Sequence, residues 1–317
     1  MIPTPSRTAR VFPWALLTAL ALFPLLAPIF GLDYYVGFVR HGLIVTIAAT
    51  SLNFILGYGG MAALGQAGFI GVGAYTVVAL VEAGFTSAWG AWAAAFGVSA
   101  AVAAAIGAVS LRTRGVYFLM ITLAFAEMLH HLAVSLRIWG GDDGYGLYAP
   151  LDLGMGLGDA QGRTLYWVVL ALAALLFAFL NRVAVSRFGY ALRGIRDNET
   201  RMEALGYPVQ WIKFAAFVAA GAVAGLAGAL LACHNRFVSP SLMHWTESAT
   251  LLVIVVIGGL GRRWGAPLGA AVWLTLTETL KLYTEYWRWP LGLLLILIVF
   301  LAPRGLAALV EDPGKTT

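Results

Sequence analysis

Long runs of apolar residues dominate this chain, and short polar or charged stretches separate them. Most runs lack the polar stripe that a helix on a water-soluble protein keeps. Many also reach the roughly 18–20 residues that a helix needs to cross a bilayer. The apolar segments are residues 11–30, 37–57, 61–81, 88–110, 115–136, 164–181, 211–233, 242–260, 266–283 and 288–303. The pattern predicts an all-α polytopic membrane protein of about ten transmembrane helices, with the glycine-broken third and eighth segments kinked or partly re-entrant.

Composition supports this class. Hydrophobic residues make up 61% of the 317 residues and charged residues only 11%, and the mean hydropathy is +0.84. The single cysteine, Cys233, excludes an intramolecular disulfide and a cysteine metal cluster. No stretch outside the apolar segments is long enough for a second domain. We therefore expect one membrane domain over residues 1–317, and we do not interpret the net charge of +5 as a sign of nucleic-acid binding.

The distribution of basic residues predicts the orientation. If the N-terminus is cytoplasmic and the chain crosses ten times, most of the twenty Lys and Arg residues fall on the cytoplasmic side, as the positive-inside rule requires. Both termini and residues 186–209 are then cytoplasmic, and the loop over residues 137–163 faces outward. This count treats residues 11–30 as a retained first helix, which we favour over a cleaved signal peptide.

Residues 186–209 concentrate charge between two apolar segments. Asp197 and Asn198 are favourable N-cap residues, while Gly206 and the following proline are typical of a helix end. The sequence therefore predicts a short helix over residues 199–205, preceded by another over 190–196. A helix this short is marginal in water by itself, so it needs a surface to pack on.

The short helix has an apolar face with Met202 and Leu205, surrounded by charges. Two interpretations remain open from these residues. The segment either lies on its own membrane domain with its arginines near lipid headgroups, or docks into a cleft of a cytoplasmic partner.

Polar residues inside the apolar segments mark candidate path residues. The glycine-rich third segment contains Gln66, Gly71 and Tyr75, and the fifth contains Glu127. Irregular backbone in a membrane is tolerated only where protein or a watery cavity surrounds it, so we expect the third segment to be central and to line a translocation path. For Gln66 the alternative is an interhelical hydrogen bond. For Glu127 it is a structural pair, because a carboxylate in hydrocarbon must be paired, protonated or turned inward.

Catalytic patterns are missing from the sequence. It contains no G-x-S-x-G or H-E-x-x-H pattern and no metal-ligand spacing, so we predict neither catalytic nor metal-binding residues. The tail at residues 314–317 (GKTT) resembles the end of a phosphate-binding loop, but Leu309 stands where the first glycine must be. We therefore expect a protein that is not an enzyme and that binds no cofactor itself.

Four sequence stretches, in order, resemble one transporter family. They are residues 64–75 (LGQAGFIGVGAY), 114–127 (RGVYFLMITLAFAE), 186–206 (SRFGYALRGIRDNETRMEALG) and 258–269 (GGLGRRWGAPLG). Together they resemble the permease subunits of ABC importers for branched-chain and other hydrophobic amino acids, on the LivM-like side of that family. The resemblance covers residues 35 to 305.

This resemblance implies partners and a mechanism. A second, LivH-like permease would complete the pathway in the bacterial inner (plasma) membrane, and two cytoplasmic ATPase subunits would bind ATP and Mg. An extracytoplasmic binding protein would deliver the substrate, and alternating access would move it inward. The matching segment 186–206 would couple the permease to the ATPases. The expected coupling residues are Arg193, Arg196, Asp197, Glu199, Met202, Glu203, Leu205 and Gly206.

The outward loop departs from the family pattern. Family members often carry a polar, glycine-rich run after the fifth helix, where this chain has Trp139 followed by Gly140, Gly141, Asp142, Asp143 and Gly144. We expect residues 141–144 to dock the binding protein or to admit substrate. The added charge leaves urea, short amides or aromatic acids open as substrates. A secondary transporter driven by an ion gradient, with Glu127 as its coupling group, is the alternative from another class, and an assembly subunit without a path of its own is a further one.

Overall fold

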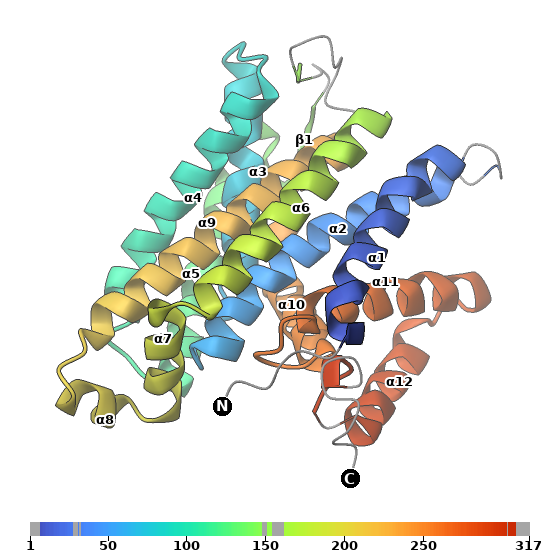
Figure 1. Ribbon diagram of the computed structural model, residues 1–317. Helices are drawn as coiled ribbons and strands as arrows, with labels where there is room; N and C mark the ends of the chain where they lie inside the picture. The colour runs from blue at the N-terminus through green and yellow to red at the C-terminus, as the bar shows by residue number, and fades with distance from the viewer. Residues whose placement is uncertain are drawn as a thin grey trace.

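The computed structural model describes residues 7–27, 31, 33–147, 151–153, 162–302 and 304–308. Within them, one long helix lies in each predicted apolar segment (Figure 1). These helices are α1 (Arg7–Leu26), α2 (Asp33–Asn53), α3 (Gln66–Glu82), α4 (Ala88–Ser110), α5 (Val116–Ser135), α6 (Gly162–Ala184), α9 (Val209–Asn235), α10 (Trp245–Gly258), α11 (Gly265–Tyr283) and α12 (Arg288–Leu301). The predicted all-α class is confirmed. The tail at 314–317 lies outside the described residues.

Five helices are long and apolar enough to cross a membrane. They are α2 with its continuation to Tyr58, α4, α5, α6 and α9. Shorter apolar stretches lie in α1, α3, α10 and α12. Length and composition therefore indicate a multi-pass membrane protein, while the number of ten crossings and the orientation of the termini stay predictions.

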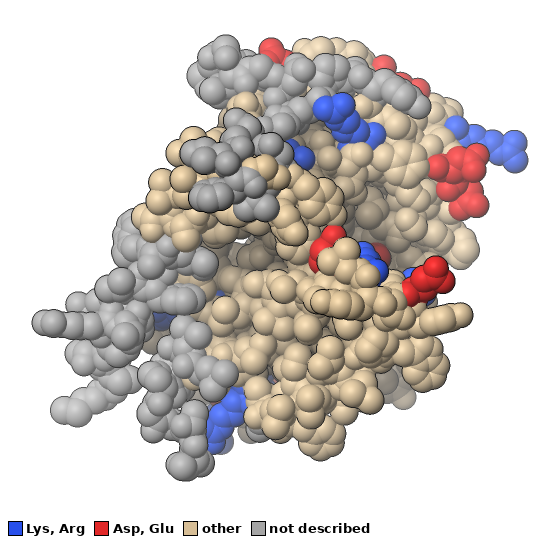
Figure 2. Space-filling view, turned by 90° about the vertical axis from the view of Figure 1, so that its right-hand side faces the viewer, with Lys and Arg blue, Asp and Glu red and all other residues tan. Residues whose placement is uncertain are grey.

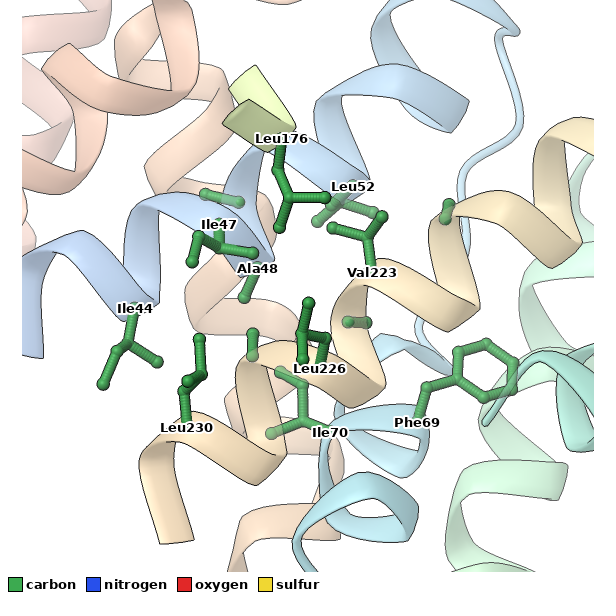
Figure 3. Close-up of a cluster of buried hydrophobic side chains, with 14 of the residues drawn as sticks. Ile44, Ile47, Ala48, Leu52, Phe69, Ile70, Leu176, Val223, Leu226 and Leu230 are labelled. Atoms are coloured by element: carbon green, nitrogen blue, oxygen red, sulfur yellow. The ribbon is translucent and has the colours of Figure 1, made fainter. Parts of the chain in front are cut away.

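Helix α9 is the centre of the bundle and packs on α2, α3 and α4. Small residues make this packing close. A Cβ on Gly73 would lie 1.9 Å from the carbonyl oxygen of Gly225, and one on Gly228 would lie 1.8 Å from that of Ile70. Lipid gives helices no hydrophobic reason to associate, so such close backbone approach gains the dispersion contacts that hold them together. Figure 3 shows aliphatic side chains such as Ile44 and Leu230 filling the space between α2 and α9.

The third apolar segment is helical only from Gln66 onward. Helix α2 runs into the π-helical η1 (Phe54–Tyr58), and an irregular stretch follows. Asn53 fixes this region, because its side chain donates to the carbonyl of Arg262 and accepts from the N–H of Gly261, both at 2.9 Å. The irregular backbone is thus covered by protein, as membrane-embedded backbone must be.

The two ends of the bundle differ (Figure 1). At one end lie α7 (Arg187–Asp197) and α8 (Glu199–Ala204). At the other, β1 (Tyr145–Gly146) pairs antiparallel with β2 (Phe237–Val238). Short 3-10 turns flank the strands, and these are η2 (Arg137–Trp139), η3 (Gly141–Asp143) and η4 (Pro240–Met243). Residues 148–150 and 154–161 of the predicted outward loop lie outside the described residues.

One side of the bundle carries scattered charges on a largely uncharged surface. Figure 2 views it from the side of α11 and α12, where acidic and basic side chains stand in the middle of the face and along its upper and right-hand edges. Large apolar side chains stand out here, including Leu282, Trp289 and Phe300, each about four-fifths exposed (79%, 83% and 80%). A surface of this kind suits contact with lipid or with another membrane-embedded chain.

Candidate functional site

The charged segment folds as two short helices packed on the bundle. Leu192 and Ile195 of α7 are buried, so this helix is anchored by its apolar face. Asn198 caps α8, its Oδ1 accepting the N–H of Arg201 at 2.9 Å, and Gly206 follows with a φ of +82°. The predicted short helix and its cap are confirmed. The upstream helix is longer than the predicted 190–196, because its first turn continues back to Arg187.

Two of the predicted coupling arginines turn toward the bundle. Arg196 donates through Nη1 to the carbonyl oxygen of Gly57 at 2.6 Å, and its Nη2 lies 3.2 Å from Oδ1 of Asp197. Arg193 donates to the carbonyl oxygen of Ala184, and its guanidinium lies 5.4 Å from the ring centre of Tyr58. Both arginines therefore hold α7 against neighbouring elements.

The two predicted glutamates form ion pairs that tie α8 to the bundle. Glu199 lies 2.7 Å from Nζ of Lys213, at the start of α9, and 3.3 Å from Arg114, just before α5. Glu203 lies 3.3 Å from the same arginine. The side chains of Glu199 and Lys213 are only 17% and 10% exposed, so losing either would leave a poorly solvated charge.

The predicted apolar face of α8 is split by the fold. Met202 is half-buried and packs against Gly194 of α7, where a Cβ would lie 2.8 Å from the methionine sulfur. Leu205 is 66% exposed. The predicted apolar face is therefore only partly free for docking, because the turn at residue 198 folds α8 back onto α7 and covers part of Met202. Asp197 and Leu205 remain accessible at this end.

A cavity of about 400 Å³ adjoins the same unit. Its lining includes Met61, Phe118 and Ile195 together with four of the charged groups described above, Arg114, Arg196, Glu199 and Lys213. The α7–α8 unit therefore borders free space at its inner face, beside the irregular stretch that leads to α3.

The predicted path residues do not line the 400 Å³ cavity. Gln66 is fully buried, and its Nε2 donates to Oγ of Ser51 at 2.6 Å and to the carbonyl of Ala220 at 3.3 Å. This is the geometry of the interhelical hydrogen bond that was the alternative interpretation. Tyr75 is 5% exposed, with its ring 6.5 Å from that of Trp139.

Gly71 and Glu127 also serve packing and capping. A Cβ on Gly71 would lie 2.1 Å from the side chain of Met243, so the glycine gives that methionine its space. Oε1 of Glu127 accepts the N–H of Trp245 at 3.4 Å, in the first turn of α10. A carboxylate there is favoured by the partial positive charge of a helix N-terminus. The path role of these residues stays a prediction.

The run 141–144, predicted to face outward, follows a turn that depends on glycine. Gly140 and Gly144 have φ angles of +86° and +81°, which favour glycine. A Cβ on Gly144 would also lie 2.6 Å from the carbonyl oxygen of Val238 in β2. Asp142 and Asp143 are exposed between the two glycines, so the loop presents two carboxylates on this turn.

A second cavity, of about 310 Å³, was not predicted from the sequence. It lies between α2, α3, α9, α10 and α11, and its lining includes Glu247, Thr250, Leu251 and Ile254 of α10. The four residues fall at helical spacing on one face, and on α2 the lining positions 41, 44, 45 and 48 do the same. The sequence signal available for this cavity was the stripe on α10, which is polar at its N-terminal end and apolar further along. In the described residues, no cluster of His, Cys, Asp and Glu is suited to a metal ion.

Comparison with known proteins identifies the family. The model of the branched-chain amino acid transport system permease component matches residues 34–302. The chain belongs to this family. The resemblance drawn from the four sequence stretches is therefore confirmed, and the chain is a transport permease component rather than an enzyme. No solved structure matches it.

Individual permease proteins are also similar to this chain. The high-affinity branched-chain amino acid transport system permease proteins LivM of Salmonella typhimurium and Escherichia coli are each 31% identical over 296 residues, which is 86% of this chain and 70% of theirs. A probable branched-chain amino acid transport permease protein LivM of Methanocaldococcus jannaschii is 26% identical over 189 residues, 54% of each chain. This chain is similar to all three.

Proposed function

We propose that this chain is a permease subunit of an ABC importer for branched-chain amino acids in the bacterial inner membrane. The observation that carries the proposal is the charged α7–α8 unit, braced at one end of an apolar bundle, in a chain of this family. In the proposed topology the chain crosses the membrane ten times with both termini cytoplasmic, and α7–α8 faces the cytoplasm.

Coupling to the ATPases follows from the contacts of α7–α8. An ATPase partner binds the accessible surface around Asp197 and Leu205, and closure of the ATPase pair moves this surface. The ion pairs of Glu199 pass the displacement to α9, and the bond from Arg196 passes it to η1. Because nucleotide and substrate favour different states of the bundle, their binding free energies are linked.

The other subunits are assigned by the same reasoning. ATP and Mg bind to the ATPase subunits, and this chain binds no cofactor. A second, LivH-like permease packs beside this one, for which the exposed apolar side chains of α11 and α12, such as Leu282, Trp289 and Phe300, are suited. An extracytoplasmic binding protein docks at the opposite end, where Asp142 and Asp143 are exposed on the glycine turn.

Reconstitution tests the proposal. The chain is placed in liposomes with its candidate ATPases, partner permease and binding protein, and uptake of radiolabelled leucine is measured. We expect uptake only when ATP and the ATPase subunits are present. Uptake without the ATPases that follows a proton or sodium gradient would instead support the ion-coupled alternative. Uptake of urea or an aromatic acid in place of leucine would overturn the substrate assignment.

Surface variants test the docking face. Asp197→Arg combined with Leu205→Asp should abolish co-purification of the ATPases, while the permease keeps its elution volume and thermal stability. Glu285→Arg is the matched control, because this exposed residue lies in the α11–α12 turn, away from α7–α8. Normal ATPase binding by the double variant would show that the partner grips a different surface.

A further inference from the structure

The 310 Å³ cavity lies toward the end of the bundle opposite α7–α8. It is lined by residues of the last turns of α9, of the middle of α2 and of α10 between residues 247 and 254. The other ends of these helices meet near α7–α8, since α9 begins just after α8 and Arg196 reaches Gly57 beyond α2. Its volume falls at the small end of the roughly 300–1,000 Å³ of ligand pockets.

The floor of the cavity is aliphatic and buried. Ile44 and Ala48 of α2 and Ile254 of α10 contribute to it, with exposed fractions of 2%, 3% and 1%. Ile70 of α3 and Leu231 of α9 complete the floor. Such a surface holds a branched hydrocarbon group and offers nothing to a charged or strongly polar one.

The mouth of the cavity is polar. Glu247 and Asn235 are exposed there, while His41 and Thr250 are half-buried. No Lys or Arg of the described residues forms an ion pair with Glu247. The lining therefore changes from an accessible carboxylate, amide, hydroxyl and imidazole at the mouth to buried hydrocarbon at the floor.

Ring and guanidinium groups of α2 and α9 lie together beside the mouth, and His41 is the one among them that lines the cavity. The rings of His41 and His234 stack with their centres 5.6 Å apart, and Nε of Arg40 donates to Nδ1 of His234 at 2.8 Å. The acidic group, Glu247, comes from α10. The mouth thus has an imidazole and an amide on the side of α2 and α9, and a carboxyl group on the side of α10, above one apolar floor.

A free aliphatic α-amino acid has the complementary shape. Its ammonium and carboxylate groups sit on one carbon, and its side chain points away from both. We propose that this cavity binds one such amino acid within this single chain, with the ammonium on Glu247, the carboxylate on His41 and Asn235, and the side chain on the aliphatic floor. Thr250, one turn from Glu247, adds a hydroxyl beside the charged groups.

This inference rests on the proposed import function for the direction of travel, because substrate arriving at the outer end meets the polar mouth first. It goes beyond that function by giving the permease a substrate site of its own. Selection would then operate in the membrane chain as well as in a binding protein.

Ligand analogues test the site with the wild-type chain. The purified full-length permease is placed in lipid nanodiscs, and displacement of radiolabelled leucine is measured. Isocaproate lacks the ammonium, isoamylamine lacks the carboxylate, and glycine lacks the side chain. Each should bind at least about tenfold more weakly than leucine, because each leaves a charged group or the floor without its partner. Equal binding of isocaproate and leucine, or no saturable leucine binding up to millimolar concentrations, would overturn the site.

A variant locates the ammonium subsite. Glu247→Gln should weaken leucine binding at least about tenfold and leave isocaproate binding as in the wild type, which also shows that the pocket is folded. Glu285→Gln, at an exposed glutamate outside the cavity lining, is the control and should change neither. Unchanged leucine affinity in the Glu247 variant would place the ammonium elsewhere and reject the assignment.

Different results would contradict the proposed binding site and the proposed import function. If leucine binds as described but uptake in liposomes does not need the ATPases, the site stands and the importer proposal falls. If uptake requires the ATPases but Glu247→Gln transports leucine with unchanged KM and maximal rate, the importer stands and the site falls.

Discussion

The α3–α4–α9 interface and the α7–α8 unit are held together by different means. At the interface, glycines bring helix backbones into contact, as where Gly228 meets the carbonyl of Ile70. The α7–α8 unit is instead joined to the bundle by side chains, chiefly Glu199 with Lys213 and Arg196 with Gly57. Backbone packing has one arrangement and resists displacement. Long charged side chains can change conformation and keep their contacts when a bound partner moves. The α3–α4–α9 interface is therefore suited to be a rigid framework, and the α7–α8 contacts are suited to be an adjustable link to the partner.

The largest expected loss of stability comes from a substitution at the α3–α4–α9 interface. Gly228→Ala should lower the stability of the permease by about 3 kcal/mol, because the new methyl group would overlap a backbone oxygen that cannot move alone. The thermal unfolding midpoint of the detergent-purified chain measures this. Gly97→Ala on α4 is the matched control, since nothing lies within 4 Å of its Cβ position. It should be neutral or stabilising by up to about 1 kcal/mol. Similar midpoints for the two variants would refute close packing at Gly228.

The next effect is at the ion pair. Lys213→Ala leaves Glu199 without its nearest cation and should cost about 2 kcal/mol. The loss should appear as faster proteolysis within residues 186–208, with little change in the global unfolding midpoint. Adding Glu199→Gln to the lysine variant should restore part of the protection. If Lys213→Ala instead lowers the global midpoint as far as Gly228→Ala does, the two regions are not distinct.

A smaller effect is expected at the helix cap. Asn198→Ala removes the acceptor for the N–H of Arg201 and should destabilise α8 by about 1 kcal/mol. Hydrogen exchange of the α8 amides, followed by mass spectrometry, measures the change. Asn198→Asp retains an acceptor and should exchange as the wild type does. Faster exchange in both variants would show that the amide group has another role.

The smallest effect is at the exposed arginine. The side chain of Arg114 is 59% exposed, so its pairs with Glu199 and Glu203 should contribute about 0.5 kcal/mol or less. Arg114→Ala should speed α8 exchange slightly at low salt and not at high salt, because screening already weakens the pair. A larger loss that salt does not change would mean that Arg114 acts through packing.

Sequence reasoning succeeded where local patterns decide structure. The ten apolar segments each contain a helix, and the cap at Asn198 lies where predicted, since both depend on residues close together in the chain. It failed for Met202, because packing on Gly194 depends on how α8 folds back onto α7. It also missed the 310 Å³ cavity, whose lining comes from α2, α3, α9, α10 and α11.

The sequence by itself therefore determined the class, the family and the position of the charged segment, because hydropathy, caps and motifs are properties of neighbouring residues. Only the tertiary structure decided which polar groups serve packing and which line open space. The side-chain nitrogen of Gln66 donates to Ser51 inside the bundle, while Glu247 stands at the mouth of a cavity. Both are single polar residues in apolar segments, and their surroundings come from helices distant in sequence, which a local pattern does not encode.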